Sequence, residues 1–181
     1  MKPYVIVAAL ALLTVGATAI AQSHKNSYAG QHTRAVSSLS ADELQSFLDG
    51  RGAGLARPAE LNGYPGPMHV LELDRPLALT AEQRLQVQAA FGRMKAKATD
   101  LGAKYVEAER KIDAAFRSGS ASDATIAAHV AEANRLLGEV RLSHLLAHLE
   151  VAQLLTPEQR VRYAELRGYG DGGRTEHRRQ H

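Results

Sequence analysis

Two apolar seams with heptad spacing, one on each side of a short break, constrain this chain more than any other feature. The first seam alternates intervals of four and three residues: Val87, Phe91, Met94, Ala98, Leu101, Tyr105, Ala108, Ile112 and Ala115. The second has the same spacing: Ile126, Val130, Ala133, Leu137, Val140, His144, Ala147 and Val151. Heptad spacing keeps apolar side chains on one side of a long helix. Because only Ser118-Gly119-Ser120 and its neighbours separate the seams, we expect an antiparallel helical hairpin over about residues 80–154.

Short helices are predicted on both sides of this hairpin. Ser40 and Glu43 form a capping box that opens a helix reaching about residue 49. Pro65 and Pro67 define a rigid turn, and residues 68–75 can then form two helical turns before Pro76 ends them. No segment has the alternating pattern of a strand. The predicted fold class is therefore all-α, a long hairpin with short flanking helices.

A Leu-Thr-x-x-Gln motif occurs twice, at Leu79, Thr80 and Gln83 and again at Leu155, Thr156 and Gln159. Each threonine is a suitable N-cap, and each glutamine stands where a capping box needs it. In a hairpin that turns near Gly119, residues whose numbers add up to about 238 lie opposite each other. Both motifs are therefore expected at the open end of the hairpin, each starting a helix.

The second long helix is apolar on a further side as well. Its extra stripe consists of leucines: Leu142, Leu145, Leu146 and Leu149. A helix with two apolar sides needs two partners. One partner is the other arm of the hairpin, and the second is either the 68–75 helix or another subunit.

The N-terminus predicts export. Lys2 precedes an uncharged run of 17 residues, and Ala19-Ile20-Ala21 has the small-x-small form of a cleavage site. We expect residues 1–21 to be a cleaved signal peptide and the protein to be periplasmic; the alternative is an uncleaved membrane anchor. The predicted plan continues with a flexible leader (22–38), one all-α domain (39–168) and a disordered basic tail (169–181).

Composition excludes several classes of function. The chain has no cysteine, so disulfides, thiolate chemistry and cysteine metal sites are absent. With 22 basic and 19 acidic residues, the charge is too balanced to indicate nucleic-acid binding. No phosphate-binding loop, HExxH or nucleophile elbow is present. We therefore expect no enzyme activity and no required cofactor.

Four side chains near the open end form a candidate metal site. His144 and His148 are one helical turn apart, and His69 and Glu72 share a face of the short helix that leads back to the same end. Imidazoles with a carboxylate suit zinc, nickel, cobalt or copper. The alternative is that these histidines only satisfy packing. Other histidines carry less weight: His129 near the hairpin turn, and His177 and His181 in the tail.

The stretches "AELNGYPGPMHVLEL", "LALTAEQR" and "HLLAHLEVAQLLTPEQRVRYAELRGYG" resemble the Spy/CpxP family of periplasmic proteins. The likeness is to its heavy-metal-sensor or resistance (CnrX-type) subgroup and covers about residues 50–170. It implies a four-helix protomer that dimerises into a cradle. In the sensor branch, His69 and His144 fall where ligands are expected and His148 lies one turn further on. The chain departs from that pattern at Leu73, which replaces a second ligand, and at Pro76.

Two functional hypotheses follow from the resemblance. The first is an ATP-independent chaperone or adaptor of the envelope or metal stress response, binding unfolded envelope proteins or a membrane signalling protein. The second is a periplasmic heavy-metal sensor or resistance protein that binds a divalent metal through histidines. A homodimer is the expected assembly in both, with membrane contact only if the N-terminal segment stays uncleaved.

Overall fold

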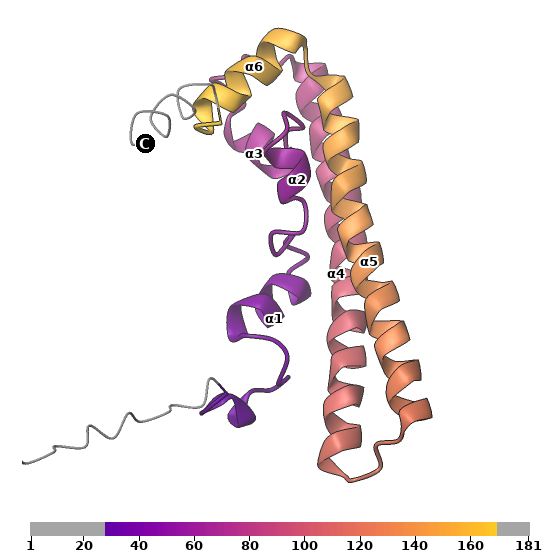
Figure 1. Cartoon of the computed structure of the whole chain (residues 1–181). Coiled ribbons are helices and arrows are strands. Elements are labelled where there is room, and N and C mark those ends of the chain that lie inside the picture. The colour runs from indigo at the N-terminus through magenta and orange to yellow at the C-terminus, as the bar shows by residue number, and fades with distance from the viewer. Residues whose placement is uncertain (1–27, 170–181) are drawn as a thin grey trace, which may run out of the picture. The chain divides into compact units, whose positions relative to one another are not determined.

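A computed structural model describes residues 28–169, and it is all helical within that range (Figure 1). Residues 28–30 form a turn that belongs to a separate unit; the fold below is that of residues 31–169. Its elements are η1 (Gln31–Thr33), α1 (Ala41–Leu48), α2 (Arg57–Glu60), α3 (Pro67–Glu72), α4 (Ala81–Arg117), α5 (Asp123–Leu154) and α6 (Pro157–Leu166). The all-α prediction is confirmed. The predicted signal peptide, and the tail beyond Tyr169, lie outside the described residues.

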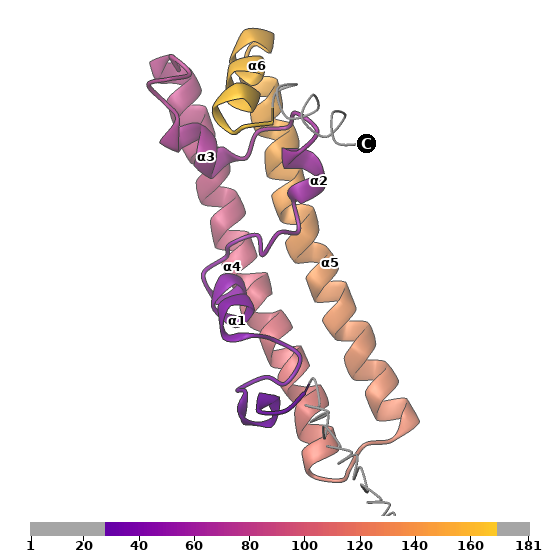
Figure 2. The ribbon, with the colours of Figure 1, turned by 60° about the vertical axis from the view of Figure 1, so that its left-hand side comes forward.

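Helices α4 and α5 form the predicted hairpin and lie side by side along their length (Figure 2). Thr80 caps α4 with a capping box to Gln83, and the Ser122 side chain accepts the Thr125 N–H at the start of α5. Gly119 takes a positive φ of 71° in the turn between them, a conformation that glycine adopts without steric penalty. Because caps and turn residues act locally, the two helices begin and end at the residues that cap or break them.

The two Leu-Thr-x-x-Gln motifs interlock at the open end of the hairpin. Gln83 Nε2 donates to Gln159 Oε1 at 2.8 Å, and Gln159 Nε2 donates to Gln83 Oε1 at 3.0 Å. Each oxygen also accepts the N–H of its own N-cap threonine. The second amide protons go to the carbonyls of Leu154 (2.9 Å) and Leu77 (3.2 Å). Each motif is thus a capping box and also one half of a fully paired bridge between α4 and α6.

An apolar cluster surrounds this bridge and includes the leucines of both motifs. Its buried members are Val70, Leu77, Leu79, Val87, Ala90, Val151, Leu155 and Tyr163. They come from α3, α4, α5, α6 and the turn before α4. The cluster therefore holds the short helices on the open end of the hairpin.

The first short helix, α1, packs closely on the middle of α4. A Cβ at Gly102 would stand 2.1 Å from the Phe47 carbonyl oxygen, so only glycine permits this approach. The Phe47 ring then lies edge-on to Tyr105, with centroids 4.8 Å apart. This contact starts the chain on its course back along the hairpin toward the open end.

The structure differs from the sequence prediction before α1. Residues 22–38 are predicted to be a flexible leader, yet Val36 is buried in the core and the Ser37 N–H donates to Asp113 at 2.7 Å. A single buried valine produces no periodic signal, so this contact could not be recognised from the sequence.

The flanking helices near the open end also differ from expectation. Helix α2 is a single turn that the glycine-rich sequence did not indicate. Helix α3 ends at Glu72, earlier than the predicted residue 75. Pro76 disfavours helical backbone at the residue before it, and the chain instead turns through Ala78, whose φ is +49°.

The leucine stripe of α5 is not covered by the 68–75 segment. Leu142, Leu146 and Leu149 are 51%, 50% and 46% exposed. The prediction that the short helix covers this side of α5 is therefore wrong. Within residues 28–169, no helix has the length and apolar character needed to cross a membrane.

Replacing Gln159 by alanine is predicted to lower the free energy of unfolding by about 2 kcal/mol, because it leaves partly buried partners on Gln83 and Leu77 unpaired. Gln86→Ala is the matched control. Within residues 28–169 the Gln86 side chain bonds to the exposed Glu82 alone, so its loss should change stability by less than about 0.5 kcal/mol. Urea unfolding measures both. Equal effects would contradict the assigned role of the bridge.

Candidate metal centre

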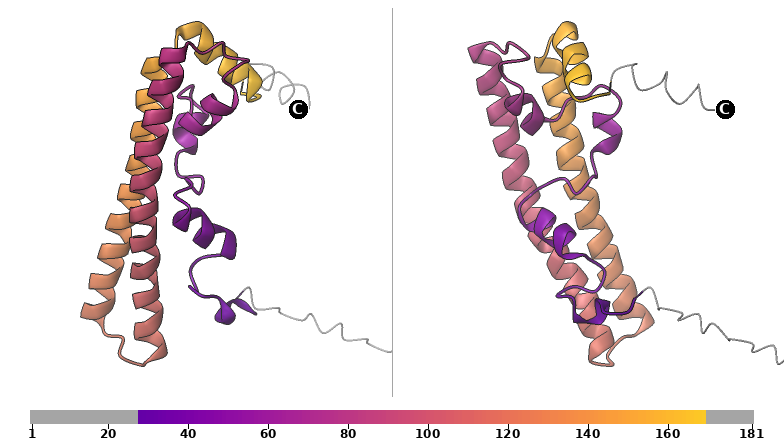
Figure 3. Two further views of the ribbon diagram at one scale, coloured as in Figure 1. Left: turned by 180° about the vertical axis from the view of Figure 1, so that it is seen from behind. Right: turned by 90° about the vertical axis from the view of Figure 1, so that its left-hand side faces the viewer.

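A cavity of about 350 Å³ lies between the α2–α3 segment and the half of the hairpin that is nearer its open end. The α2–α3 segment crosses the open half of the hairpin (Figure 3). Three of the four predicted site residues line this cavity: His69, His144 and His148. Glu72 is not among the lining residues. Met94, which the hairpin register places opposite His144, also lines it.

His144 points a free nitrogen into buried space. Its side chain is 5% exposed, and its Nδ1 lies 2.9 Å from the Val140 carbonyl oxygen. Because a carbonyl only accepts, Nδ1 must carry the proton, which leaves Nε2 as a lone pair. Nε2 is buried and has no hydrogen-bond partner in the part of the chain described. The lone pair of this nitrogen is therefore available to a ligand.

His148 is held in the same tautomer. Its Nδ1 lies 2.7 Å from the Tyr64 carbonyl oxygen, and the side chain is 9% exposed. Burial lowers the pKa of His148, against the Tyr64 hydrogen bond and the Glu60 carboxylate, which raise it. The imidazole is therefore neutral at pH 7 and its Nε2 is available as a ligand.

The Nδ1 of His69 also faces an oxygen acceptor. That acceptor is the carboxylate of Glu72, which was predicted to be a metal ligand. The Glu72 carboxylate accepts from His69 Nδ1 at 3.0 Å. A carboxylate behind an imidazole fixes the ring and raises its basicity, as in many metal sites. The structure therefore places Glu72 behind a candidate ligand, with no contact to the cavity.

Two glycines leave room beside the buried imidazoles. A Cβ at Gly52 would lie 3.4 Å from His144 Nε2, and a Cβ at Gly66 would lie 3.2 Å from His148 Nε2. The Gly66 position would also be 3.4 Å from Glu60 Oε2. The space at both Nε2 atoms thus depends on residues without side chains.

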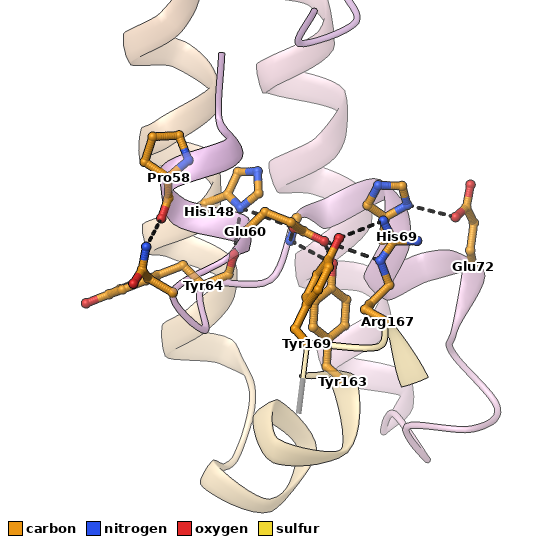
Figure 4. A network of polar contacts seen from close by, with 11 residues as sticks. Pro58, Glu60, Tyr64, His69, Glu72, His148, Tyr163, Arg167 and Tyr169 are labelled. Carbon is orange, nitrogen blue, oxygen red and sulfur yellow. Dashed lines mark hydrogen bonds and ion pairs between the residues drawn. The ribbon is translucent and has the colours of Figure 1, made fainter. Parts of the chain in front are cut away.

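Glu60 lines the cavity and was not among the site residues predicted from the sequence. Its carboxylate accepts from the Tyr163 hydroxyl (2.5 Å), the Gly66 N–H (3.2 Å) and Arg167 Nε (3.3 Å), as Figure 4 shows. It also lies 3.8 Å from His148 Nδ1. Burial and the bond to Glu60 raise the pKa of Tyr163, so its hydroxyl stays a donor. The contacts with Tyr163 and Arg167 join residues about 100 positions apart, so no local motif in the sequence could predict them.

The histidines share a cavity without forming a closed ligand cluster. Within residues 28–169, no three His, Asp or Glu side chains are grouped closely enough to hold a metal ion as they stand. His144, His148 and Gly66 nevertheless line the same cavity, and imidazole nitrogen is a ligand type that first-row metals accept. His177 and His181 lie outside the described residues.

The family model for heavy-metal resistance matches residues 44–162, well over half of the chain. The chain belongs to the heavy-metal resistance family. This confirms the Spy/CpxP-like resemblance predicted from the two Leu-Thr-x-x-Gln motifs. Neither the curated proteins nor the solved structures give a match. The matched range contains every predicted site residue, together with Glu60.

The lowered pKa of His148 predicts a specific loss of stability in acid. The unfolded chain takes up a proton near pH 6.5, whereas the folded protein resists protonation until a lower pH. Stability is therefore full above about pH 6.5 and falls as pH drops toward the folded pKa. Thermal unfolding between pH 7.5 and pH 5 should show a smaller decrease in His148→Gln, because glutamine can donate to Tyr64 but cannot be protonated. His129→Gln, outside the cavity, should behave like wild type. Equal decreases in all three proteins would refute this assignment.

Proposed function

We propose that this protein is a periplasmic metal-resistance or metal-sensing protein that binds a divalent first-row metal in the histidine cavity. The observation that carries the proposal is the buried, unpartnered Nε2 of His144 beside the second available Nε2 of His148. His69 is the third candidate ligand. In this proposal the predicted signal peptide directs the protein to the periplasm. Metal binding requires no catalytic group.

The hydrogen bonds of the three rings support the choice of ligand atom in this proposal. All three Nδ1 atoms already face oxygen acceptors: the Val140 and Tyr64 carbonyls and the Glu72 carboxylate. The Nε2 atoms are therefore the ones left for a metal. When bound, the ion would link α5 to the α2–α3 segment and stabilise the folded protein over the unfolded chain.

Calorimetric titration with zinc, nickel, cobalt and copper tests this function. The double variant His144→Ala/His148→Ala should lower the affinity for the most tightly bound of these metals by more than about tenfold. Binding to wild type should weaken below pH 6, where protons compete for the imidazoles, and should release protons there. His129→Ala is the matched control, and a chain ending at Gly170 excludes ligands in the tail. Unchanged affinity in the double variant would remove the proposed site.

The exposed leucine stripe favours a second function, binding of another protein. Leu142, Leu146 and Leu149 form one apolar ridge of α5 that the described chain leaves uncovered. In this proposal the ridge is the contact surface between two copies of the chain, and the resulting homodimer acts as an adaptor or chaperone toward unfolded envelope proteins or a membrane signalling protein.

Leu142→Ser/Leu146→Ser should shift the protein toward monomer in sedimentation experiments and reduce its suppression of client aggregation. Leu85→Ser, an exposed leucine at the start of α4, is the control and should change neither property. A double variant with wild-type assembly and wild-type suppression would contradict this second function.

A further inference from the structure

Helix α5 has a second seam with heptad spacing, on the side that faces away from α4. At about 100° per residue, this outer seam lies opposite the seam that packs inside the hairpin. Its members follow at intervals of four and three residues, and all are exposed except the half-buried Leu145: Ala124, Ala128, Ala131, Arg135, Gly138, Leu142, Leu145 and Leu149. The exposed leucine ridge therefore overlaps only the second half of a longer strip.

The outer seam is divided by side-chain size. Its first three positions are alanine, and its last three are leucine. Between the two halves, a Cβ at Gly138 would meet no other atom of the described chain within 4 Å. The Arg135 guanidinium donates to Glu132 at 2.8 Å and also to Glu139, so its charge is balanced within α5. Two such seams fit each other when they run antiparallel, because each leucine then meets an alanine.

The residue numbers determine the register of such a pair. In two identical antiparallel helices, the numbers of residues that lie opposite each other add up to a constant. A constant of about 273 aligns every layer of the two seams: Leu149 with Ala124, Leu145 with Ala128, Leu142 with Ala131, and Gly138 with Arg135. Each large side chain then packs on a small one, as knobs-into-holes packing requires. Arg135 also faces Glu139 of the second copy, beside Gly138, so it has a carboxylate partner in both chains.

This register also gives the longer contact. It pairs about 28 residues of each α5, a length of about 42 Å. A register in which leucines meet leucines, with Leu142 opposite Leu145, pairs only about 22 residues and separates Arg135 from Glu139 of the second copy. The longer contact buries more surface, which a stable dimer needs.

We propose that two copies of this chain pair antiparallel through their outer seams, with the leucine half of each α5 on the alanine half of the other. This inference rests on the homodimer proposed above, and it specifies which surface of the second copy the leucine ridge meets. No residue of the outer seam lines the histidine cavity. The pairing and the metal site can therefore be tested independently.

Because the chain has no cysteine, an introduced cysteine pair reports this register without background. Leu142→Cys/Ala131→Cys, oxidised by glutathione disulfide, should form a covalent dimer on a non-reducing gel, because each sulfur lies opposite its partner in the other copy. Within one copy the two positions are about 16 Å apart along the helix and cannot bond. The matched control is Ala103→Cys/Ala114→Cys, an exposed pair with the same spacing on α4, which should stay monomeric on the gel.

Ala131→Leu tests the fit between large and small side chains. It puts a second leucine where Leu142 of the other copy packs, so it should weaken dimerisation about tenfold although the surface becomes more apolar. Sedimentation of the full chain measures the dissociation constant. Ala131 is exposed, so the variant keeps the fold.

The outcomes separate this inference from the proposed homodimer. An unchanged or tighter dimer in Ala131→Leu overturns the register and leaves the homodimer standing. A covalent dimer from Leu142→Cys/Leu145→Cys, in place of Leu142→Cys/Ala131→Cys, shows that leucines meet leucines and overturns it too. Equal cross-linking of the α4 control shows random collision and also overturns it. A wild-type chain that stays monomeric in sedimentation refutes the homodimer itself.

Discussion

The reciprocal amide pair of Gln83 and Gln159 is the interaction on which the open end of this molecule depends. Each side chain closes its own capping box, crosses to the other motif and bonds a carbonyl there. Helix α6 is thereby fixed against the start of α4. This position brings Tyr163 and Arg167 to Glu60, so the repeated motif determines the polar boundary of a cavity to which it contributes no residue.

The cavity is arranged by hydrogen bonds on the side of each imidazole that faces away from it. Val140, Tyr64 and Glu72 hold the Nδ1 atoms, while glycines leave space at the Nε2 atoms of His144 and His148. Such an arrangement lowers the entropy lost when a ligand binds, because the rings are already oriented. Burial also lowers the pKa of His148, which keeps this imidazole neutral near pH 7.

Much of the fold could be predicted from local patterns. The heptad seams, the caps at Thr80 and Ser122 and the break at Gly119 determine α4 and α5, and the helical register correctly brought Met94 and His144 to one region. Contacts between distant segments were not predictable. Glu60 meets Tyr163 only after α6 folds back, and Val36 fills a core site without any periodic neighbour. Glu72 was expected to be a ligand because it shares a helix face with His69, yet that same proximity lets it bond His69 directly.

The tautomeric state of the histidines tests the central claim most directly. Nitrogen-15 NMR of histidine-labelled protein at pH 7.5 should show His144 and His148 protonated at Nδ1 in the metal-free state. Zinc should then shift both Nε2 resonances strongly and leave the Nδ1 protons in place. Protonation at Nε2 in the metal-free protein, or zinc shifts confined to other histidines such as His177 and His181, would contradict the account.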